Sequence, residues 1–488
     1  MIANKYSVAA ILALTALALS STAMSAVNIV IQNADDPGEG FNDPTPVAPV
    51  GGNAGTTLGQ QRLNAFAYTA NIWGAQLTSN STIIVQAQFN PLACSATSAV
   101  LGAAGTTAIF EDPTSFPKPN TWYPFALANK LVGFDIADLY FGPGSGYPHI
   151  AAEFNSDLGN PGCFTGSPFY LGLDNNVPAG QVNLVATLLH ELGHGLGFQT
   201  FTSAGGSGAE FEDNDRNAFP SIWDHFLYDN TLGKTWVQMN DQERAFSTVN
   251  ARKLVWNGLN VTTAAPTVLS LGTPVLTILA PSAVQGTYLA GSASFGAILQ
   301  DPGESKQVGQ VVDQQNGTGL ACAPLGADNA RRVKQRIALI DRGGCTFVVK
   351  VKNAQNAGAV GVIIVDNAAG SPPPGLSGSD PTITIPVVRV TRDDGARIKA
   401  AINATSSDRS SGVVARIGAN RSQLAGADEL DRVMMYTPNP YQPGSSRSHW
   451  DTSTFRNQLM EPAINADLTQ SVKPPEDLTL PLFRDIGW

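Results

Sequence analysis

One short stretch, HELGHGLGFQT at residues 190–200, restricts the fold more than any other part of this 488-residue chain. Pro178 and Gly180 precede it and favour a helix start, so VNLVATLLHELGHGL predicts a helix over residues 182–196. Two faces of that helix differ in chemistry: the apolar one holds Val182, Val185, Leu189, Leu192 and Leu196, and the adjacent one holds Thr187, His190, Glu191 and His194. Such a helix is packed on one side and chemically active on the other.

The active face has the spacing of a zinc peptidase. His190 and His194 are one helical turn apart, so both imidazoles can bind one Zn²⁺ ion. Glu191 lies beside them and reaches the zinc-activated water, for which it is the expected general base before it passes the proton to the leaving amine. With only five histidines in the chain, a chance HExxH is a poor explanation. The stretch predicts one catalytic Zn²⁺.

The third metal ligand is not adjacent. A compact HExxHxxGxxH pattern would place a histidine at position 200, where this chain has Thr200, although Gly197 still stands where the chain must turn out of the helix. The segment TSAGGSGAEFEDND reads as loop, and SIWDHFLYD is more typical of a packing histidine on an aromatic-rich helix. The candidates left open by the residues alone are His149, His225 and His449 and, in the manner of thermolysin, Glu210 or Glu212.

The first 26 residues have the pattern of a secretory signal peptide: Lys5, an apolar run over 8–19 and small residues over 21–26. No later segment approaches the length of a membrane span. The net charge of −10 argues against nucleic acid as a partner. We therefore expect an exported protein, secreted to the extracellular space or the periplasm, whose partners are protein or peptide substrates. The oligomeric state is not readable.

Export would place the four cysteines in an oxidising compartment. An even number in an oxidising compartment favours disulfides, and their neighbourhood in the sequence suggests the pairs Cys94–Cys163 and Cys322–Cys345. No two cysteines have CxxC spacing, so a cysteine-based metal site is not expected.

The pattern of apolar residues changes near residue 262. Continuous apolar runs predict buried strands over 337–341, 359–366 and 383–391, with helices over 345–357 and 392–403. DRGGCTF at 341–347, GAVGVIIVDN and IPVVRV make residues 265–418 resemble the protease-associated (PA) domain, a non-catalytic β/α module inserted in peptidases. The resemblance implies a role in substrate access or partner contact. The turn-rich loop over 368–380 is expected to be exposed.

The segment GSSRSHWDTSTFRNQLMEP contains His449 and, eleven residues later, Met460. Together with HELGHGLGF it resembles the leishmanolysin family of metzincin peptidases. That resemblance implies that His449 is the displaced third zinc ligand and that Met460 forms the methionine turn beneath the metal. This chain departs from the family in two respects. It has only four cysteines, and it lacks an obvious long propeptide with a latency cysteine.

The sequence thus predicts an α+β protein: a metzincin-like zinc peptidase catalytic domain, helix-rich with a mixed sheet, interrupted by a β/α PA domain. The closing stretch LTLPLFRDIGW predicts a docking helix. The expected ranges are a signal peptide over 1–26, the catalytic domain over 27–262 with the HExxH helix, the PA insert over 263–419, and the rest of the catalytic domain over 420–488.

The predicted function is a secreted zinc metalloendopeptidase. One alternative is a binding or adhesion protein on a degenerate peptidase scaffold, although Glu191 would have no use there. Another is an exopeptidase, since PA domains also accompany aminopeptidases, but those usually carry dinuclear Asp and Glu sites. A Ca²⁺ site in the acidic run is less expected than a solvated loop, because EF-hand spacing is absent. That run comprises Glu210, Glu212, Asp213 and Asp215.

Overall fold

The computed structural model describes residues 4–7 and 26–488, apart from 112–113, 203–205, 213–216, 314–317, 377, 379, 406–409 and 466. Most of the predicted signal peptide lies outside the described residues, and so do Asp213 and Asp215. Residues 4–7 form β1 (Asn4–Ser7), which pairs in parallel with β7 (Ala108–Glu111). Within the described residues, no helix combines the length and apolarity needed to cross a membrane.

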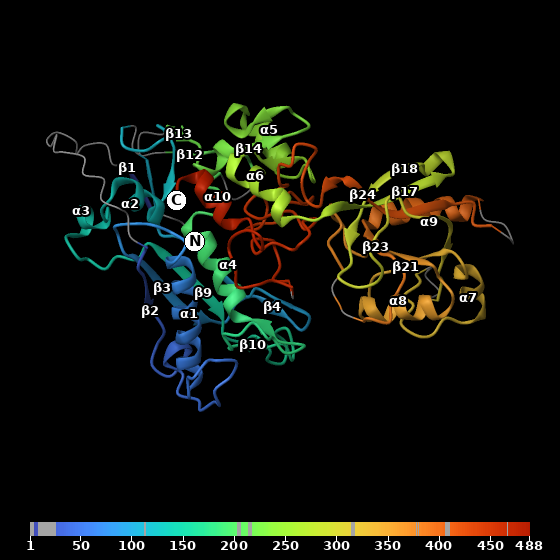
Figure 1. Ribbon diagram of the computed structural model, residues 1–488, viewed down its shortest axis with the longest axis horizontal. Helices are drawn as coiled ribbons and strands as arrows, with labels where there is room; N and C mark the ends of the chain where they lie inside the picture. Colours follow the sequence, from blue (N-terminus) through green and yellow to red (C-terminus); the bar gives the residue numbers. More distant parts are fainter. Residues whose placement is uncertain are drawn as a thin grey trace.

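The chain forms two parts, drawn side by side in Figure 1. The larger part contains residues up to about 270 and again from about 425. Its central sheet has four strands in the order β2 (Ile29–Asn33), β3 (Ile83–Asn90), β9 (Ile150–Asn155) and β6 (Gly102–Thr106). The first three run parallel, and β6 is an antiparallel edge strand. Alternate side chains of β3 are buried, as expected for a strand packed against a core.

The HExxH segment forms α4 (Leu184–Leu196), two residues shorter at its start than predicted. Asn183 caps it by accepting from the backbone N–H of Ala186 at 3.1 Å. All thirteen residues of α4 are buried, because α1 (Leu58–Gly74) and the sheet pack on one side and the C-terminal segment on the other (Figure 1). Trp73 of α1 donates from Nε1 to the carbonyl of Leu189 at 3.3 Å. The apolar stripe therefore positions the chemical face within the core.

Short elements complete the larger part, and most surround the sheet and α4. They are β4 (Cys94–Ser95), β5 (Ser98–Ala99), β8 (Tyr123–Pro124), α2 (Phe125–Val132), α3 (Ala137–Phe141), β10 (Phe169–Tyr170), β11 (Val182–Asn183), β12 (Phe211–Glu212), β13 (Ala218–Phe219), β14 (Leu227–Asp229), β15 (Lys234–Thr235), α5 (Asp241–Ser247), β16 (Leu254–Trp256), α6 (Leu259–Val268), α10 (Thr479–Ile486) and the 3₁₀ turns η1 (Gly40–Asn42), η2 (Trp223–Phe226) and η3 (Trp236–Gln238). The predicted docking helix is α10, whose apolar side chains enter the same core.

The smaller part is built on one eight-stranded sheet. Its strands, in spatial order, are β18 (Gly286–Leu289), β17 (Leu271–Ala280), β24 (Val414–Leu424), β20 (Ser305–Gln310), β21 (Ile337–Asp341), β22 (Gly361–Val365), β23 (Val387–Val390) and β19 (Gly291–Ser292). The helices are α7 (Ala327–Val333), α8 (Phe347–Asn356) and α9 (Arg392–Thr405), with a 3₁₀ turn η4 (Ser282–Val284). Strands β21, β22 and β23 are buried throughout, because separate apolar clusters cover both faces of the sheet.

The expected boundaries at 262 and 419 fall inside secondary-structure elements. Helix α6 continues through residue 262, and its Val261, Ala265 and Val268 belong to the core of the larger part. Strand β24 continues past 419 to Leu424, where it still pairs with Leu271 of β17. We therefore propose junctions near 270 and 424.

The smaller part is attached at more than its two junctions. The backbones of Ser371 and Asn439 exchange hydrogen bonds of 2.8 and 2.6 Å. Arg252 donates to the carbonyl of Ala290 at 3.2 Å and to Asp451 at 3.2 Å. The expectation that the loop over 368–380 is exposed is wrong in part, since the residues beside this contact, Pro372, Pro373 and Leu376, are buried.

Both predicted disulfides are present. Cys94–Cys163 lies in the larger part, where it ties the β4–β5 hairpin to the segment after β9. Cys322–Cys345 lies in the smaller part, ahead of α8. Each bond stays within one part.

Gly195 of α4 lies against β9, and we predict that Gly195→Ala destabilises the larger part. A Cβ at this position would lie 2.4 Å from Cγ2 of Ile150, and such overpacking costs about 1–3 kcal/mol. Alanine is otherwise the better helix former, so a net loss isolates the clash. Urea unfolding followed by tryptophan fluorescence measures it, because all seven tryptophans lie outside residues 271–424. Gly105→Ala, where a Cβ meets only Oε1 of Gln199 at 3.5 Å, is the control. Equal midpoints for the two variants would contradict the packing.

Candidate metal centre

Three imidazoles from distant parts of the chain meet in the core of the larger part. The Nε2 atom of His194 lies 3.1 Å from that of His190 and 3.1 Å from that of His449, and the remaining Nε2 pair is 3.2 Å apart. Helix α4 supplies the first two, and a segment 255 residues further along the chain supplies the third. Within the described residues, these three are the group of histidine, cysteine and acidic side chains that could hold a metal ion.

The remaining ring nitrogens fix the protonation of all three histidines. Nδ1 of His190 lies 2.7 Å from the carbonyl oxygen of Leu459, Nδ1 of His194 lies 2.7 Å from that of Phe198, and Nδ1 of His449 lies 3.0 Å from that of Ser445. A carbonyl oxygen only accepts, so each Nδ1 carries the hydrogen. In a neutral imidazole, Nε2 then presents a bare lone pair.

The donor set fits Zn²⁺. Three lone pairs that face each other at 3.1–3.2 Å repel unless a cation lies between them. Tetrahedral zinc with Zn–N distances of about 2.0–2.1 Å requires ligand nitrogens about 3.3–3.4 Å apart. The observed spacing is close to that requirement, and one open coordination position would remain for chemistry.

The surroundings keep the imidazoles neutral. Their residues are only 5–8% exposed. Burial lowers the pKa of His190 to about 4 and that of His194 to about 3. It also holds the pKa of His449 well below its ordinary value, with the neighbouring histidines acting in the same direction. Neutral imidazole is the form that binds metals.

Glu191 is buried on the same helix beside the triad. Burial raises its pKa to about 8, while a hydrogen bond from the backbone N–H of Ala104 acts in the opposite direction. Ala104 belongs to β6, the edge strand of the sheet. The carboxylate is therefore positioned between the imidazole-bearing helix and an open strand edge.

Met460 lies beneath the site. Its Sδ would be 2.9 Å from a Cβ at Gly193, so the glycine between the two helix histidines gives the thioether room. The carbonyl of Met460 accepts from the backbone N–H of Trp450 at 2.9 Å. Trp450 is fully buried and packs edge-on against Phe198.

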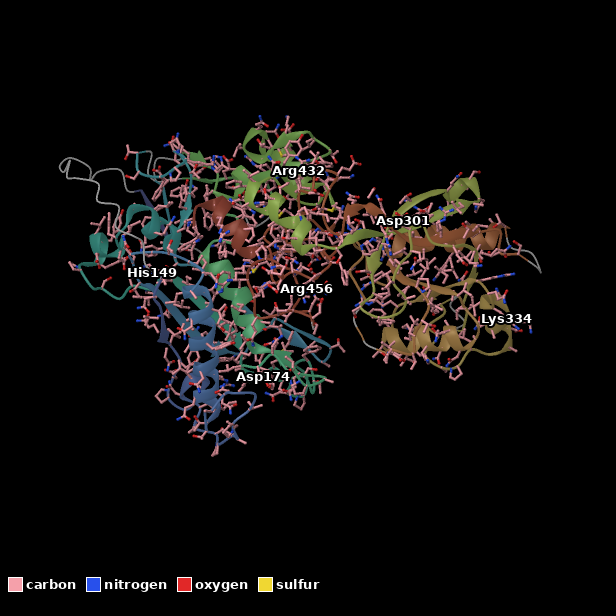
Figure 2. All side chains as sticks on the ribbon, viewed as in Figure 1. His149, Asp174, Asp301, Lys334, Arg432 and Arg456 are labelled. Atoms are coloured by element: carbon pink, nitrogen blue, oxygen red, sulfur yellow. A yellow bond between two sulfur atoms is a disulfide. The ribbon has the colours of Figure 1, made fainter. Side chains whose placement is uncertain are left out.

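The other candidate ligands lie elsewhere. His149, labelled in Figure 2, accepts from the N–H of Ile84 and contacts Asp135 through Nε2 at 3.1 Å. His225 is hydrogen-bonded to Thr121 at 3.0 Å and lies in a 3₁₀ turn, not the predicted helix. Glu210 pairs with Arg244 at 3.1 Å, and Glu212 is exposed on β12. None of the four joins the imidazole cluster.

A buried polar network lies behind the third histidine. Asp451 pairs with Arg252 at 3.2 Å, and both are almost fully buried. Glu461 follows Met460 and accepts from the hydroxyl of Thr454 and from the N–H of Gln458. This network anchors the segment that carries both His449 and Met460.

Sequence reasoning did not find the groups that orient the imidazoles. These groups are the backbone carbonyls of Leu459, Phe198 and Ser445 and the backbone N–H of Ala104. Every residue has such groups, so the amino-acid sequence does not reveal which of them contact the site. The one signal available was the pair of glycines inside the helix, Gly193 and Gly195, since small residues in a helix suggest a close approach.

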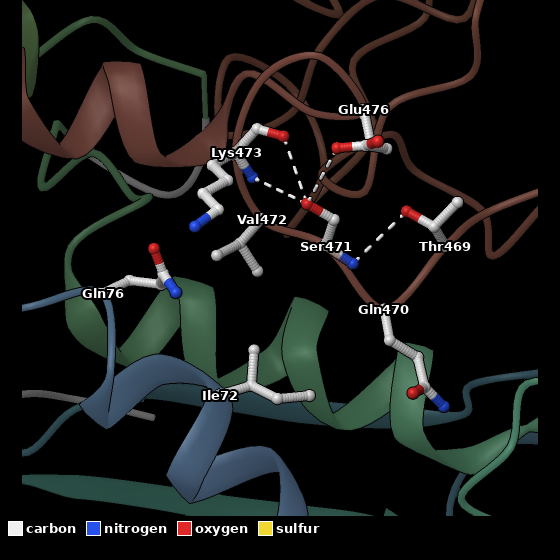
Figure 3. A pocket seen from close by; sticks show the side chains of 8 residues that line it. All are labelled: Ile72, Gln76, Thr469, Gln470, Ser471, Val472, Lys473 and Glu476. Atoms are coloured by element: carbon white, nitrogen blue, oxygen red, sulfur yellow. Dashed lines mark hydrogen bonds between the residues drawn. The ribbon is translucent and has the colours of Figure 1, made fainter.

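A hollow of about 400 Å³ lies between α1 and the segment that follows Met460 (Figure 3). The three histidines are not among its lining residues, which are Ile72, Gln76, Thr469, Gln470, Ser471, Val472, Lys473 and Glu476. It is therefore separate from the candidate metal centre.

Comparison with known proteins identifies one module. Residues 307–398 match the PA domain family, so the smaller part contains a PA domain. Among curated proteins, the chain is 42% identical to human ER degradation-enhancing alpha-mannosidase-like protein 3 over 82 residues, which is 17% of this chain and 8% of that protein. It is 43% identical over 74 residues to aminopeptidase YwaD of Bacillus subtilis, 15% of this chain and 16% of the relative. This chain covers only 8% and 16% of the length of these two relatives, so their activities are not transferred to it.

Solved structures give weak similarity. A zinc aminopeptidase from Bacillus subtilis covers 34% of this chain and 38% of its own, with 22% identity and a TM-score of 0.23. An aminopeptidase from Aneurinibacillus sp. strain AM-1 has a TM-score of 0.23 at 20% identity, covering 31% of each chain. Scores of this size carry no argument about fold or chemistry. The resemblance to leishmanolysin gains no support from these comparisons.

We predict that Glu461→Gln flattens the pH dependence of stability. Burial raises the pKa of Glu461 to about 8 in the folded protein, against about 4.3 in an unfolded chain. The folded state therefore retains a proton that the unfolded state releases, and this group makes stability decline as pH rises from about 4.3 through about 8. Urea midpoints at pH 5, 6, 7 and 8 check this. The exposed Glu39→Gln is the matched control, and parallel curves for wild type and Glu461→Gln would contradict the prediction.

Proposed function

We propose that this protein is a secreted zinc-dependent metalloendopeptidase of the metzincin type, similar to leishmanolysin. His190, His194 and His449 are the proposed ligands, and Met460 is the proposed methionine turn. The observation that carries the proposal is the convergence of three bare Nε2 atoms at 3.1–3.2 Å beside the buried Glu191. Bound Zn²⁺ would polarise a scissile carbonyl and acidify a water molecule.

Glu191 supplies the proton transfers in this proposal. Its carboxylate takes a proton from the attacking water and later delivers it to the leaving amine. A binding protein that used a purely structural metal would need no base at this position. The intact carboxylate therefore favours an enzyme over the degenerate-scaffold alternative.

The edge strand beside Glu191 favours a peptide substrate. Leu101 and Thr107 flank β6: the carbonyl of Leu101 accepts from the N–H of Asn155, and the N–H of Thr107 donates to the carbonyl of His149. By strand alternation, Gly102 and Ala104 therefore turn their backbone groups away from β9. Ala104 already uses its N–H to hold Glu191. We propose that an extended peptide adds to this edge as a further strand and passes the metal. Binding along a strand edge suits cleavage within a chain, so the products of casein should be internal fragments and not single amino acids.

Secretion is part of the same proposal. Disulfides such as these two form and persist in an oxidising compartment. The predicted signal peptide would direct the protein to export.

Glu191→Ala should abolish most casein hydrolysis without removing the metal. Loss of a general base lowers kcat by about 10²–10⁴-fold, whereas the three imidazoles remain. Hydrolysis with and without a chelator, together with the zinc content by atomic absorption, measures both parts. Full activity of Glu191→Ala, or of wild type in excess chelator, would rule out the proposed chemistry.

His449→Ala should lose both zinc and activity, since only two ligands remain. His225→Ala is the matched control, because that histidine binds Thr121 and not the cluster, and it should retain metal and hydrolysis. An unchanged zinc content in His449→Ala would refute the leishmanolysin-like ligand set.

A further inference from the structure

Asp477 is a buried carboxylate, 2% exposed, two residues before α10. Its two oxygens have different partners. Oδ1 accepts from the backbone N–H of Thr479 at 2.8 Å and from the hydroxyl of the same residue. Oδ2 accepts from the backbone N–H of Leu459 at 2.7 Å. The first set closes a local turn, whereas the second reaches a different segment.

Leu459 connects this carboxylate to the imidazole cluster. Its carbonyl oxygen lies 2.7 Å from Nδ1 of His190, and its side chain is 1% exposed. The N–H and C=O of Leu459 belong to the two peptide groups on either side of its Cα. Asp477 therefore acts by fixing the position of the residue, not by polarising the carbonyl directly.

His190 differs from the other two histidines in how its ring is held. His194 bonds to the carbonyl of Phe198, four residues onward, and His449 bonds to that of Ser445, four residues back. Those carbonyls are set by the local chain. The carbonyl that orients His190 is 269 residues away in sequence, so a tertiary contact must fix it.

We propose that Asp477 is a positioning residue for divalent-metal binding: it fixes Leu459, whose carbonyl fixes the His190 ring in the orientation that binds the ion. This rests on the proposed metal site. Hydrogen-bonded groups that orient a ligand histidine typically contribute 10–100-fold in metal affinity.

Asp485 offers a matched control on the other end of α10. It accepts from Nε1 of Trp256 at 2.9 Å and from the backbone N–H of Asn260 at 2.8 Å, which ties α10 to α6. None of these contacts of Asp485 leads to an imidazole. Asp485→Asn therefore disturbs the docking of the same helix by the same chemical change.

The experiment measures the Zn²⁺ dissociation constant of the full metal-free chain by competition with a chelator, alongside its thermal unfolding. Asp477→Asn should weaken Zn²⁺ binding by about 10–100-fold. Asp485→Asn should change the Zn²⁺ affinity less than about twofold, even if its Tm falls as much as that of Asp477→Asn. Thr479→Val, which leaves the Oδ2 contact intact, should behave like Asp485→Asn. With Co²⁺ in place of Zn²⁺, Asp477→Asn should also alter the visible absorption bands.

Equal Zn²⁺ affinity for Asp477→Asn and wild type, or equal losses for Asp477→Asn and Asp485→Asn, would overturn the inference. Failure of wild type to bind Zn²⁺ would instead overturn the proposed metal site. If Asp477→Asn does not fold, hydrogen exchange on wild type decides the question. Coupling is reciprocal, so Zn²⁺ must slow exchange of the Leu459 amide, and an unchanged rate would refute the inference.

Discussion

Three imidazole lone pairs that point at one another are the interaction on which the rest of this structure depends. Buried acceptors without donors are costly, so the arrangement is stable only when each ring is held from behind or a cation lies in front. The chain does the first with three backbone carbonyls, those of Leu459, Phe198 and Ser445. Each carbonyl also sets the tautomer, which leaves Nε2 free for a metal. The fold must therefore bring main chain, and not only side chains, to the back of the site.

The two chain segments that flank the PA domain lie side by side. The backbone of Ser270 donates to the carbonyl of Phe455 at 2.6 Å and accepts from the N–H of Ala425 at 2.9 Å. The PA domain thus leaves and re-enters the larger core at adjacent points, and β17 and β24 pair along their length beyond them. Because loop closure becomes only slowly more costly with length, the insert adds little to the cost of assembling the triad. The insert also contacts Asn439 directly and Asp451 through Arg252. Asn439 and Asp451 lie on either side of His449 in the sequence.

What the sequence could predict follows from how local each feature is. Helix α4, both disulfides and three of the eight strands of the smaller part, β21, β22 and β23, were predicted within a few residues from short-range patterns. The convergence of His449 with α4 was expected only through a resemblance, because no local pattern connects residues so far apart. The carbonyl of Leu459 could not be predicted, since a backbone group has no side-chain signature. The role of Asp477 could not be predicted either, because its side chain contacts the cluster only through the backbone of Leu459. The loop over 368–380 was expected to be exposed for its turn residues, yet Pro372 and Leu376 are buried where the PA domain meets Asn439.

The structure also explains why position 200 holds a threonine. The chain leaves α4 at Gly197 with a φ of +129°, and a Cβ there would lie 3.1 Å from Cδ1 of Ile486. Thr200 then donates its hydroxyl to Asp224 at 3.0 Å. Asp224 lies in η2, and its neighbour Trp223 donates from Nε1 to the carbonyl of Arg447 at 3.2 Å. Arg447 is two residues before His449. The hydroxyl of Thr200 therefore holds the 3₁₀ turn whose Trp223 bonds to the segment before His449, and a histidine at position 200 would lose that hydroxyl contact.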